Sequence, residues 1–186
     1  NGIIELISDV MKGVNTMSFK AFSNEEIQEI LDHMLGCMSK ESLKQQIQKY
    51  GSEEKYREYL AAGFSNEQAI ADVFKWYGSK EKAMEAIMQS TGDVKEFKQE
   101  QDKNTEIYKK FMAAKETGDA NVEKEAVEQL AENYKEMFKL DNARSILLDL
   151  ASEYLQKQKL AEATDSQFGN GCSEYVAYAI KKYYGV

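Results

Sequence analysis

The chain has 186 residues, contains no proline, and carries 32 Asp plus Glu against 24 Lys plus Arg, for a formal net charge of −8. That acidic balance excludes a broad basic surface for nucleic-acid phosphates, so we expect no DNA binding by this chain itself. Without proline, the abundant Glu, Lys, Gln, Ala and Leu keep helices unbroken, and the composition predicts an all-α protein.

The first predicted element is an amphipathic helix at the start of the chain. Its apolar residues Ile3, Ile7, Val10 and Val14 follow the a/d pattern of a coiled-coil seam. Two heptads are marginal as an isolated helix, so the same stripe also fits a helix that folds back on its own domain, and the spacing favours neither. Because the chain opens without a helix cap or a methionine, we expect it to be a piece of a longer protein.

Several short helices with clear start and stop signals follow. Ser23 to Glu26 is a capping box, and Ser65 to Gln68 repeats the device. Glycines fall where these helices should end, since glycine enters the left-handed cap conformation at little cost. The predicted helices span residues 24–36, 40–50, 53–62, 66–77 and 80–90.

A weak internal repeat runs through the same region. The residues Phe, Ser, Asn, Glu that begin at Phe22 recur from Phe64, and the residues Tyr, Gly, Ser that begin at Tyr50 recur from Tyr77. The spacing between the two motifs differs from one copy to the other, which excludes a solenoid. A partial duplication and a chance reuse of good capping residues are both open.

A long helix comes next, opened by a third capping box over residues 93–96 and ending near Thr117, with Gly118 after it. Its apolar anchors are Phe97, Tyr108, Phe111 and Met112, and Gln101, Asn104 and Thr105 interrupt their stripe. This half-polar inner face predicts either a helix that bends over a solvated cleft or two turns that are simply exposed.

Two apolar-striped helices form the centre of the C-terminal half. The first carries Val127, Leu130, Tyr134, Met137 and Phe138, and the second carries Ala143, Ile146, Leu147, Leu150, Tyr154 and Leu155. Only Lys139 and Leu140 separate the stripes, which predicts a tight bend, a cap from Asp141 or Asn142, and two helices that pack on each other. After a break at residues 168–171, a last helix has the stripe Cys172, Tyr175, Val176, Ala179 and Tyr183.

Signatures of enzymes and metal sites are lacking. His33 is the only histidine, which excludes a zinc-binding His pair, a catalytic triad and a haem ligand pair, and we expect it on the surface or in packing. Cys37 and Cys172 lie far apart and predict reduced thiols. The carboxylates alternate with lysines at helical spacing, which is typical of solvated faces. We therefore expect a protein that is not an enzyme and has no cofactor or metal.

No apolar run approaches the roughly 20 residues that span a bilayer, and no signal-peptide pattern opens the chain. We expect a cytoplasmic protein without a membrane partner.

Its aromatic content, eleven Tyr, eight Phe and one Trp, exceeds what a helical core of this size needs, and tyrosine suits surfaces where an apolar body meets a polar ligand. Trp76 and Tyr77 lie in the segment with the poorest apolar pattern. Their rings either bind an apolar ligand that orders this segment, or cover the core from outside.

The C-terminal half resembles a known family in the order and near-spacing of its motifs. The motif residues are Glu106, Ile107, Tyr108, Gly118, Ala131, Glu132, Leu150 to Tyr154, Phe168 to Gly171, Ala179 and Ile180. Together they resemble the TipAS-like antibiotic-recognition domain, the effector half of MerR-family transcription activators. The likeness covers residues 93 to 184.

Two features nearer the N-terminus are similar to the same family. The apolar stripe of the first helix, followed by Met17, Ser18, Phe19 and Phe22, resembles the end of the dimerisation helix where it enters the effector domain. The stretches at Tyr50 and Tyr77 both look like a motif that the family has once. The extra element between Ser39 and Gly63 is therefore a departure from the family pattern.

The resemblance implies three regions: the end of a dimerisation coiled-coil helix over residues 1–16, a short-helix segment over 17–92 that is loosely ordered and partly duplicated, and a compact, globin-like helical core without haem over 93–186. It implies a homodimer through the first helix. It also implies a drug sensor that binds bulky hydrophobic antibiotics and signals to a winged-helix DNA-binding domain absent from this chain. The expected ligand-binding residues are Tyr108, Phe111, Tyr134, Phe138, Asn142, Trp76 and Tyr77.

One position departs from the family in a way that affects the chemistry. Aligned without gaps from Phe138 to Tyr154, the cysteine with which thiopeptide-binding members capture their ligand falls on Asn142. An amide does not add to a dehydroalanine as a thiolate does, so we expect non-covalent binding. The alternative function is a helical protein-interaction module whose groove takes a partner helix, and an open groove without an enclosed pocket would favour it.

Overall fold

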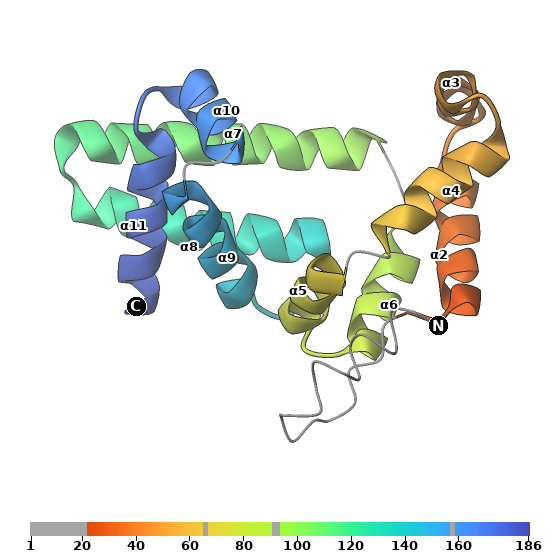
Figure 1. Ribbon diagram of the computed structural model, residues 1–186. Coiled ribbons are helices and arrows are strands. Elements are labelled where there is room, and N and C mark those ends of the chain that lie inside the picture. Colours follow the sequence, from red (N-terminus) through yellow and green to blue (C-terminus); the bar gives the residue numbers. More distant parts are fainter. Residues whose placement is uncertain (1–21, 65–66, 91–93, 157–158) are drawn as a thin grey trace. The chain divides into compact units, whose positions relative to one another are not determined.

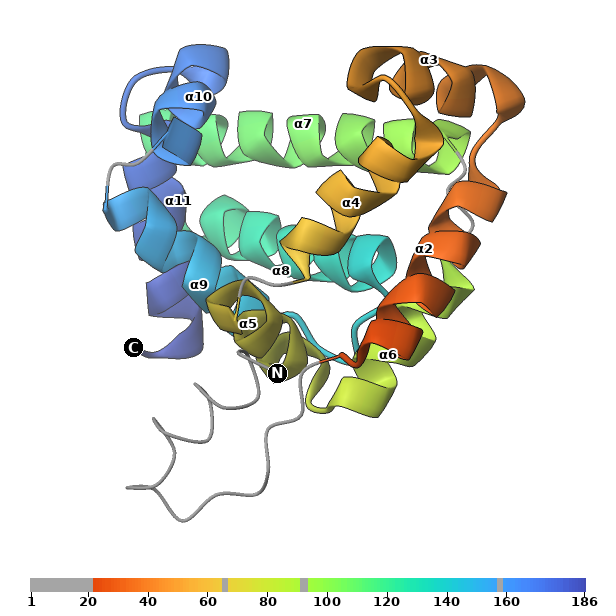
Figure 2. The same ribbon diagram turned by 45° about the vertical axis from the view of Figure 1, so that its right-hand side comes forward.

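The computed structural model describes residues 22–64, 67–90, 94–156 and 159–186, and every regular element in them is a helix, which confirms the all-α class (Figure 1, Figure 2). The predicted helix of residues 3–14 and the capping boxes of residues 65–68 and 93–96 rest on residues outside these ranges. The described helices are α2 (Asn24–Cys37), α3 (Lys40–Tyr50), α4 (Glu53–Gly63), α5 (Glu67–Tyr77), α6 (Lys80–Gln89), α7 (Val94–Thr117), α8 (Ala120–Phe138), α9 (Arg144–Leu155), α10 (Lys159–Phe168) and α11 (Cys172–Tyr184).

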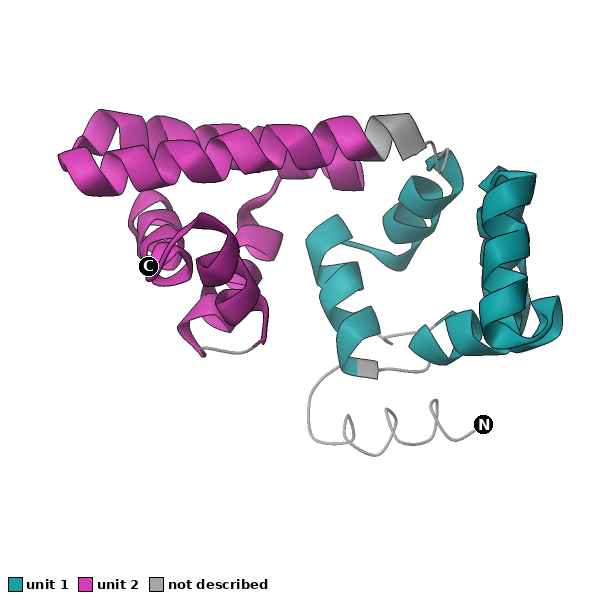
Figure 3. Ribbon diagram, turned by 90° about the horizontal axis from the view of Figure 1, so that it is seen from above, with its two compact units in different colours: residues 1–93 teal, residues 94–186 magenta. Residues whose placement is uncertain are grey.

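The helices belong to two compact units, residues 1–93 and residues 94–186 (Figure 3). The five short helices of the first unit begin and end within one residue of their predicted positions. The capping box at the start of α2 forms as predicted: Ser23 Oγ accepts from the N–H of Glu26 at 3.2 Å, and the Glu26 carboxylate accepts from the N–H of Ser23 at 2.6 Å.

Aromatic rings hold the core of the first unit together. Phe22 is buried and meets Phe64 and Phe74 edge to face, with ring centroids 5.9 Å and 5.0 Å away. Ile30 of α2 and Ile70 of α5 complete this cluster together with Ala83 of α6. By contrast, α3 and α4 contribute no fully buried residue, so they add an outer hairpin to a core built by α2, α5 and α6.

The two Tyr-Gly-Ser stretches build the same turn. Gly51 and Gly78 both take positive φ angles, 94° and 83°. Ser52 and Ser79 follow with identical backbone angles, φ −158° and ψ 164°, and each caps the next helix by accepting from the N–H three residues later. The weak repeat in the sequence thus corresponds to a repeated helix–turn–helix connection, α3 to α4 and α5 to α6.

In the second unit, α7 packs along α8, and α9 packs along α11. A tight turn at Gly118, with φ 69°, and an N-cap at Asp119 join α7 to α8 as an antiparallel pair (Figure 1). α10 packs against α11 and α9. The fully buried side chains come from all but the shortest of these helices: Phe111, Val127, Leu130, Leu147, Cys172, Val176 and Ile180.

The sequence predicts that the helices now assigned as α8 and α9 pack on each other, whereas the structure packs α8 chiefly along α7 and α9 chiefly along α11. They are not among the closely packed helix pairs of the described residues, and the link between them runs over residues 139–143 rather than two residues. Lys139 ends α8 in the left-handed conformation with φ 54°, and Leu140 is buried. The N-cap of α9 is Ala143 and not the predicted Asp141 or Asn142, although Asn142 Oδ1 accepts from the N–H of Arg144, the first residue of the helix, at 3.2 Å. An apolar stripe identifies a buried face, but it does not identify the helix that covers it.

Candidate functional site

A buried aromatic cluster joins three of the sequence motifs of the second unit. The hydroxyls of Tyr108 on α7 and Tyr154 on α9 lie 2.6 Å apart, and the Tyr108 ring stacks on Phe168 at the end of α10 with centroids 4.9 Å apart. Thr164 Oγ1 lies 3.1 Å from the Tyr154 hydroxyl and 2.9 Å from the carbonyl oxygen of Leu160. Because each hydroxyl has one proton, a chain from Tyr108 through Tyr154 and Thr164 to that carbonyl satisfies every donor.

This cluster is uncharged. Burial raises the pKa of Tyr108 well above its ordinary value, with smaller contributions from the neighbouring hydroxyls of Tyr134 and Tyr154. Burial also raises the pKa of Tyr154. The hydroxyls therefore act as neutral hydrogen-bonding groups inside an apolar core, where an unpaired hydroxyl would be costly.

The predicted ligand-binding residues of the second unit extend from its core to its surface. Tyr108 and Phe111 are 2% and 0% exposed, and their rings meet edge to face at 6.1 Å. Tyr134 is half-buried and packs on Phe138 with ring centroids 5.4 Å apart, and Phe138 is 36% exposed. Asn142 is exposed on the link to α9. The structure thus brings together two ring pairs; their contact with a ligand stays a prediction.

Trp76 and Tyr77 lie in the first unit, on α5, and both are half-buried. Tyr77 packs against the apolar cluster around Phe22 and Phe74, and burial raises the pKa of its hydroxyl. Its ring therefore covers that core from outside, which is one of the two roles that the sequence left open for it.

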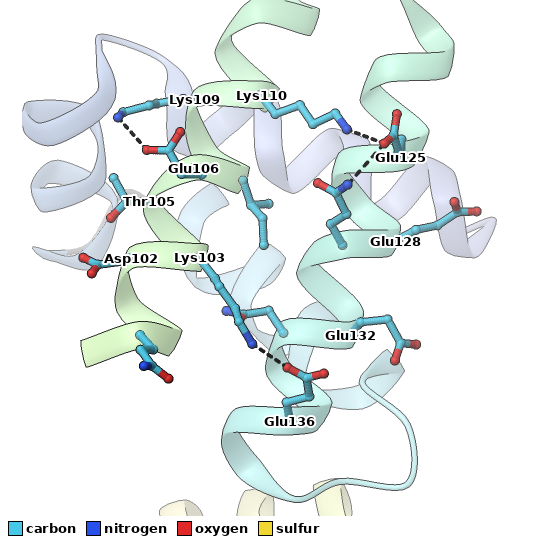
Figure 4. A pocket seen from close by; sticks show the side chains of 14 residues that line it. Asp102, Lys103, Thr105, Glu106, Lys109, Lys110, Glu125, Glu128, Glu132 and Glu136 are labelled. Atoms are coloured by element: carbon cyan, nitrogen blue, oxygen red, sulfur yellow. Dashed lines mark hydrogen bonds and ion pairs between the residues drawn. The ribbon is translucent and has the colours of Figure 1, made fainter. Parts of the chain in front are cut away.

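A groove that the sequence did not predict runs along the second unit between α7 and α8, with a volume of about 1190 Å³ (Figure 4). Its lining consists almost entirely of charged and polar residues: Gln99, Asp102, Lys103, Thr105, Glu106, Ile107, Lys109, Lys110, Glu125, Glu128, Gln129, Glu132, Asn133 and Glu136. Six carboxylates and three lysines give this lining a formal charge of −3. Sequence reasoning assigned such carboxylates to solvated faces, and the interrupted stripe of α7 was the single sign of a cleft.

Two ion pairs cross the groove from one helix to the other. Lys110 meets Glu125 at 2.5 Å and Lys103 meets Glu136 at 2.9 Å (Figure 4). The Lys103 ammonium lowers the pKa of Glu136, and the Glu136 and Glu100 carboxylates raise the pKa of Lys103. Because Glu125, Lys103 and Glu136 are more than half exposed and Lys110 is 26% exposed, each pair stabilises the fold by at most about 1 kcal/mol.

Polar atoms without partners lie where α7 and α8 meet. Asn133 lines the groove and is 3% exposed, and its amide nitrogen donates to the carbonyl oxygen of Glu100 at 3.4 Å. Within the described residues, Asn133 Oδ1, Asn104 Oδ1 and Glu100 Oε2 are buried and have no hydrogen-bond partner. Buried acceptors nearly always have a donor. Of the residues that interrupt the stripe of α7, Asn104 and Thr105 are half-buried and Gln101 is exposed, so this face is only partly exposed.

Within the described ranges, the remaining polar groups form no further site of the classes considered. Cys37 and Cys172 are free thiols, as predicted, and burial raises the pKa of Cys172 to about 11. His33 is half-buried, and its Nε2 lies 2.9 Å from the carbonyl oxygen of Ser90, which is consistent with the expected role on the surface or in packing. Among the described residues no group of three or more His, Cys, Asp or Glu side chains is placed to hold a metal ion. No helix in the described part of the chain combines the length and apolar character needed to cross a membrane.

Comparisons with protein families, with curated protein sequences and with solved structures find no match to this chain.

Proposed function

We propose that this chain is the ligand-sensing effector domain of a MerR-type transcriptional regulator, and that its second unit binds bulky hydrophobic antibiotics without a covalent bond. One observation carries the proposal. Tyr108, Tyr154 and Phe168 come from three separate motifs of the TipAS likeness, and they meet in one hydrogen-bonded, stacked cluster. Motifs that follow one another along the chain in the same order as in a family are expected to contact each other if the chain has that family's fold.

In this proposal residues 93–186 form a globin-like core without haem, and residues 1–16 end a dimerisation helix. A winged-helix domain outside this chain contacts DNA, which is consistent with the acidic charge of the effector domain. Ligand binding in the effector domain shifts the regulator toward its activating state only if the ligand binds that state more tightly than the inactive state.

The ligand contacts begin at the surface end of the aromatic series. Phe138 presents a partly exposed ring, and Tyr134 packs directly behind it. Tyr108 and Phe111 are too deeply buried to touch a ligand in the described conformation, so they form the wall behind the site. A bulky ligand that moves the Tyr134 ring would reach them.

The test is a titration of the full chain with a panel of hydrophobic antibiotics that includes thiopeptides. We expect one class to raise the melting temperature saturably, because a ligand at a hundred times its Kd stabilises the folded state by about 2.7 kcal/mol. Trp76, the only tryptophan, supplies a fluorescence signal from the first unit. No change in melting temperature or fluorescence across the panel would refute the proposal.

Two matched variants locate the site. Phe138→Ala removes the exposed ring and should weaken binding at least tenfold, while the fold survives because that ring is not part of the core. Tyr178→Ala removes a ring that is 57% exposed on α11, a helix that carries none of the predicted residues, and should bind as the wild type does. Equal losses in the two variants would contradict a site at Phe138.

A second candidate is the helical interaction module, which the open groove between α7 and α8 favours. Lys103 and Lys110 lie seven residues apart, so the two crossing ion pairs are about 10 Å apart along α7. A partner helix is about as wide as that interval and would have to break both pairs to lie along the floor. We therefore rank this function second; saturable binding of an amphipathic peptide, with no response to any antibiotic, would reverse the order.

A further inference from the structure

A thiol, an imidazole nitrogen and a backbone carbonyl oxygen converge where the ends of α2 and α6 meet in the first unit. His33 and Cys37 lie four residues apart on α2, the spacing at which two helical side chains can share one metal ion. Cys37 Sγ lies 3.7 Å from His33 Nε2. The carbonyl oxygen of Ser90, the residue that follows α6, lies 2.9 Å from Nε2 and 3.6 Å from Sγ. The three atoms therefore form a closed triangle.

The dimensions of this triangle are close to those of one face of a tetrahedral zinc site. Zinc lies about 2.3 Å from a thiolate sulfur and about 2.0 to 2.2 Å from an imidazole nitrogen or an oxygen ligand, so tetrahedral angles separate two such ligands by about 3.4 to 3.6 Å. The two edges that meet at Cys37 Sγ, 3.7 Å and 3.6 Å long, agree with these values. The third edge, from His33 Nε2 to the Ser90 carbonyl oxygen, is a hydrogen bond of 2.9 Å and must open by about 0.5 Å.

The surroundings of the triangle favour a cation. Cys37 is the last residue of α2 and Ser90 is the C-cap of α6, so the negative ends of two helix dipoles lie at the site. Neither of these two helices has a basic residue in its last turn that could occupy the same position. His33 and Cys37 are half-buried and Ser90 is exposed, so an ion can reach the triangle from solvent.

We propose that His33 Nε2, Cys37 Sγ and the Ser90 carbonyl oxygen bind one zinc ion, with water as the fourth ligand. When the ion binds, the Cys37 thiol releases its proton to solvent, and the neutral His33 imidazole carries its one proton on Nδ1. A thiolate and an imidazole select zinc over magnesium or calcium, which prefer a shell of oxygen ligands. The bound ion ties the end of α2 to the end of α6.

The site has two side-chain ligands and a carbonyl oxygen, so it differs from the groups of three or more His, Cys, Asp or Glu side chains that the described residues lack. We expect weaker binding than at a structural zinc site with four protein ligands. The sequence gave no sign of it because the third ligand is a backbone atom on another helix. The site shares no residue with those expected to bind an antibiotic, so either proposal can fail without the other.

The test is titration of the reduced full chain with cobalt(II), which replaces zinc and reports its ligands by absorption. We expect a thiolate-to-cobalt charge-transfer band in the near ultraviolet and visible bands of tetrahedral intensity, both saturating at one ion per chain. Zinc should remove these bands by displacing the cobalt, because thiolate and imidazole ligands in tetrahedral geometry suit zinc. Magnesium should leave them unchanged.

Matched variants identify the ligands. Cys37→Ala should lose the charge-transfer band, whereas Cys172→Ala should keep it, because the Cys172 thiol is fully buried in the second unit. His33→Gln keeps a side-chain N–H for the Ser90 carbonyl but lacks the imidazole nitrogen, so it should weaken cobalt binding about tenfold or more. Ser90→Ala keeps the carbonyl oxygen and should bind as the wild type does.

Four results would each overturn the proposal. The first is the absence of a charge-transfer band, and the second is a band that is lost in Cys172→Ala but kept in Cys37→Ala. The third is wild-type cobalt affinity in His33→Gln, which would leave His33 in a packing role only. The fourth is saturation at one ion per two chains, which would place the thiolates of two chains on one ion.

Discussion

Glu123 links α8 to α11 through one carboxylate. Its Oε2 accepts from the Tyr175 hydroxyl at 2.7 Å, and its Oε1 accepts from the Lys182 ammonium at 2.8 Å. Burial by itself raises the pKa of Glu123, but the hydrogen bonds from Lys182 and Tyr175 outweigh it and hold the pKa below its ordinary value. A residue on the polar side of α8 therefore makes a tertiary contact in the ionised state.

This contact makes stability depend on pH. Because the pKa of Glu123 is lower in the folded than in the unfolded chain, its stabilisation is complete above the unfolded pKa and is lost as pH falls through the folded pKa. Glu123→Gln should lower the free energy of unfolding by about 1 kcal/mol at neutral pH, and the difference from wild type should shrink from about pH 6 to about pH 3. Urea unfolding followed by circular dichroism at several pH values measures it. Glu174→Gln, exposed on α11, should show no such difference.

Asn142 decides between reversible and covalent capture if the proposed function is right. Its side chain is exposed, and its Oδ1 accepts a hydrogen bond from the backbone N–H of Arg144. Asn142→Cys places a thiol where the resembled family has its capturing cysteine, and with a thiopeptide that contains dehydroalanine we expect a covalent adduct, seen as a mass increase equal to the ligand. The wild type, which already contains Cys37 and Cys172, is the control and should gain no mass. Modification of both proteins alike would show capture at another cysteine.

At the scale of the helix, the end of α8 carries the one described non-glycine residue with positive φ, Lys139 at 54°. Its left-handed conformation lets the N–H of Leu140 bond to the carbonyl oxygen of Lys135 at 3.0 Å and directs Leu140 into the core. Glycine usually occupies this position because a side chain there costs about 1 to 2 kcal/mol. The conformation is tolerated here because the buried Leu140 fixes the direction of the link.

Lys139→Gly should therefore stabilise the protein. We expect the relief of strain to exceed the greater entropy of glycine in the unfolded chain, with a net gain of about 0.5 to 1 kcal/mol and a higher melting temperature. Lys124→Gly, at an exposed position inside the same helix, is the matched control and should lose about 1 kcal/mol. A loss of stability in both variants would mean that the Lys139 side chain contributes more than its backbone costs.

At the scale of the whole molecule, the chain consists of two units with separate cores. Phe22 and its neighbours form the core of residues 1–93, and the fully buried Phe111, Leu147 and Ile180 belong to residues 94–186. The second unit also contains the aromatic cluster and the groove, so both lie within one stretch of sequence.

We expect residues 94–186 to fold without the first unit, because their buried residues and hydrogen bonds are supplied within that stretch and its length suffices for a core. The isolated fragment should show helical circular dichroism and a cooperative thermal transition. Leu147→Ala in the fragment should lower the free energy of unfolding by about 2 to 5 kcal/mol, since the side chain is fully buried. A fragment without a cooperative transition, or one insensitive to this substitution, would contradict an autonomous core.

The aromatic part of the candidate site could be proposed from sequence because its residues sit in recognisable motifs. Tyr108 and Phe168 stand in the family likeness, and their contact needed only the right helix faces. The groove could not be proposed in this way. The sequence pattern around Asn133 and Glu136 is typical of a solvated face. Only the register of α8 against α7 places these two residues opposite Glu100 and Lys103. α10 was missed as well, since Ala161 and Thr164 are its only buried residues and leave a weak apolar stripe.

The sequence by itself determined the helical class and most helix ends, because composition, serine caps and glycine stops act within one turn of the chain. It could not determine which helices pack together most closely: α8 packs chiefly on α7, and α9 chiefly on α11, although the stripes of α8 and α9 are neighbours in sequence. An apolar stripe stabilises any complementary face by nearly the same amount, so the choice among partners depends on how all faces fit together. Tertiary packing alone therefore decided that α7 and α8 enclose an acidic groove.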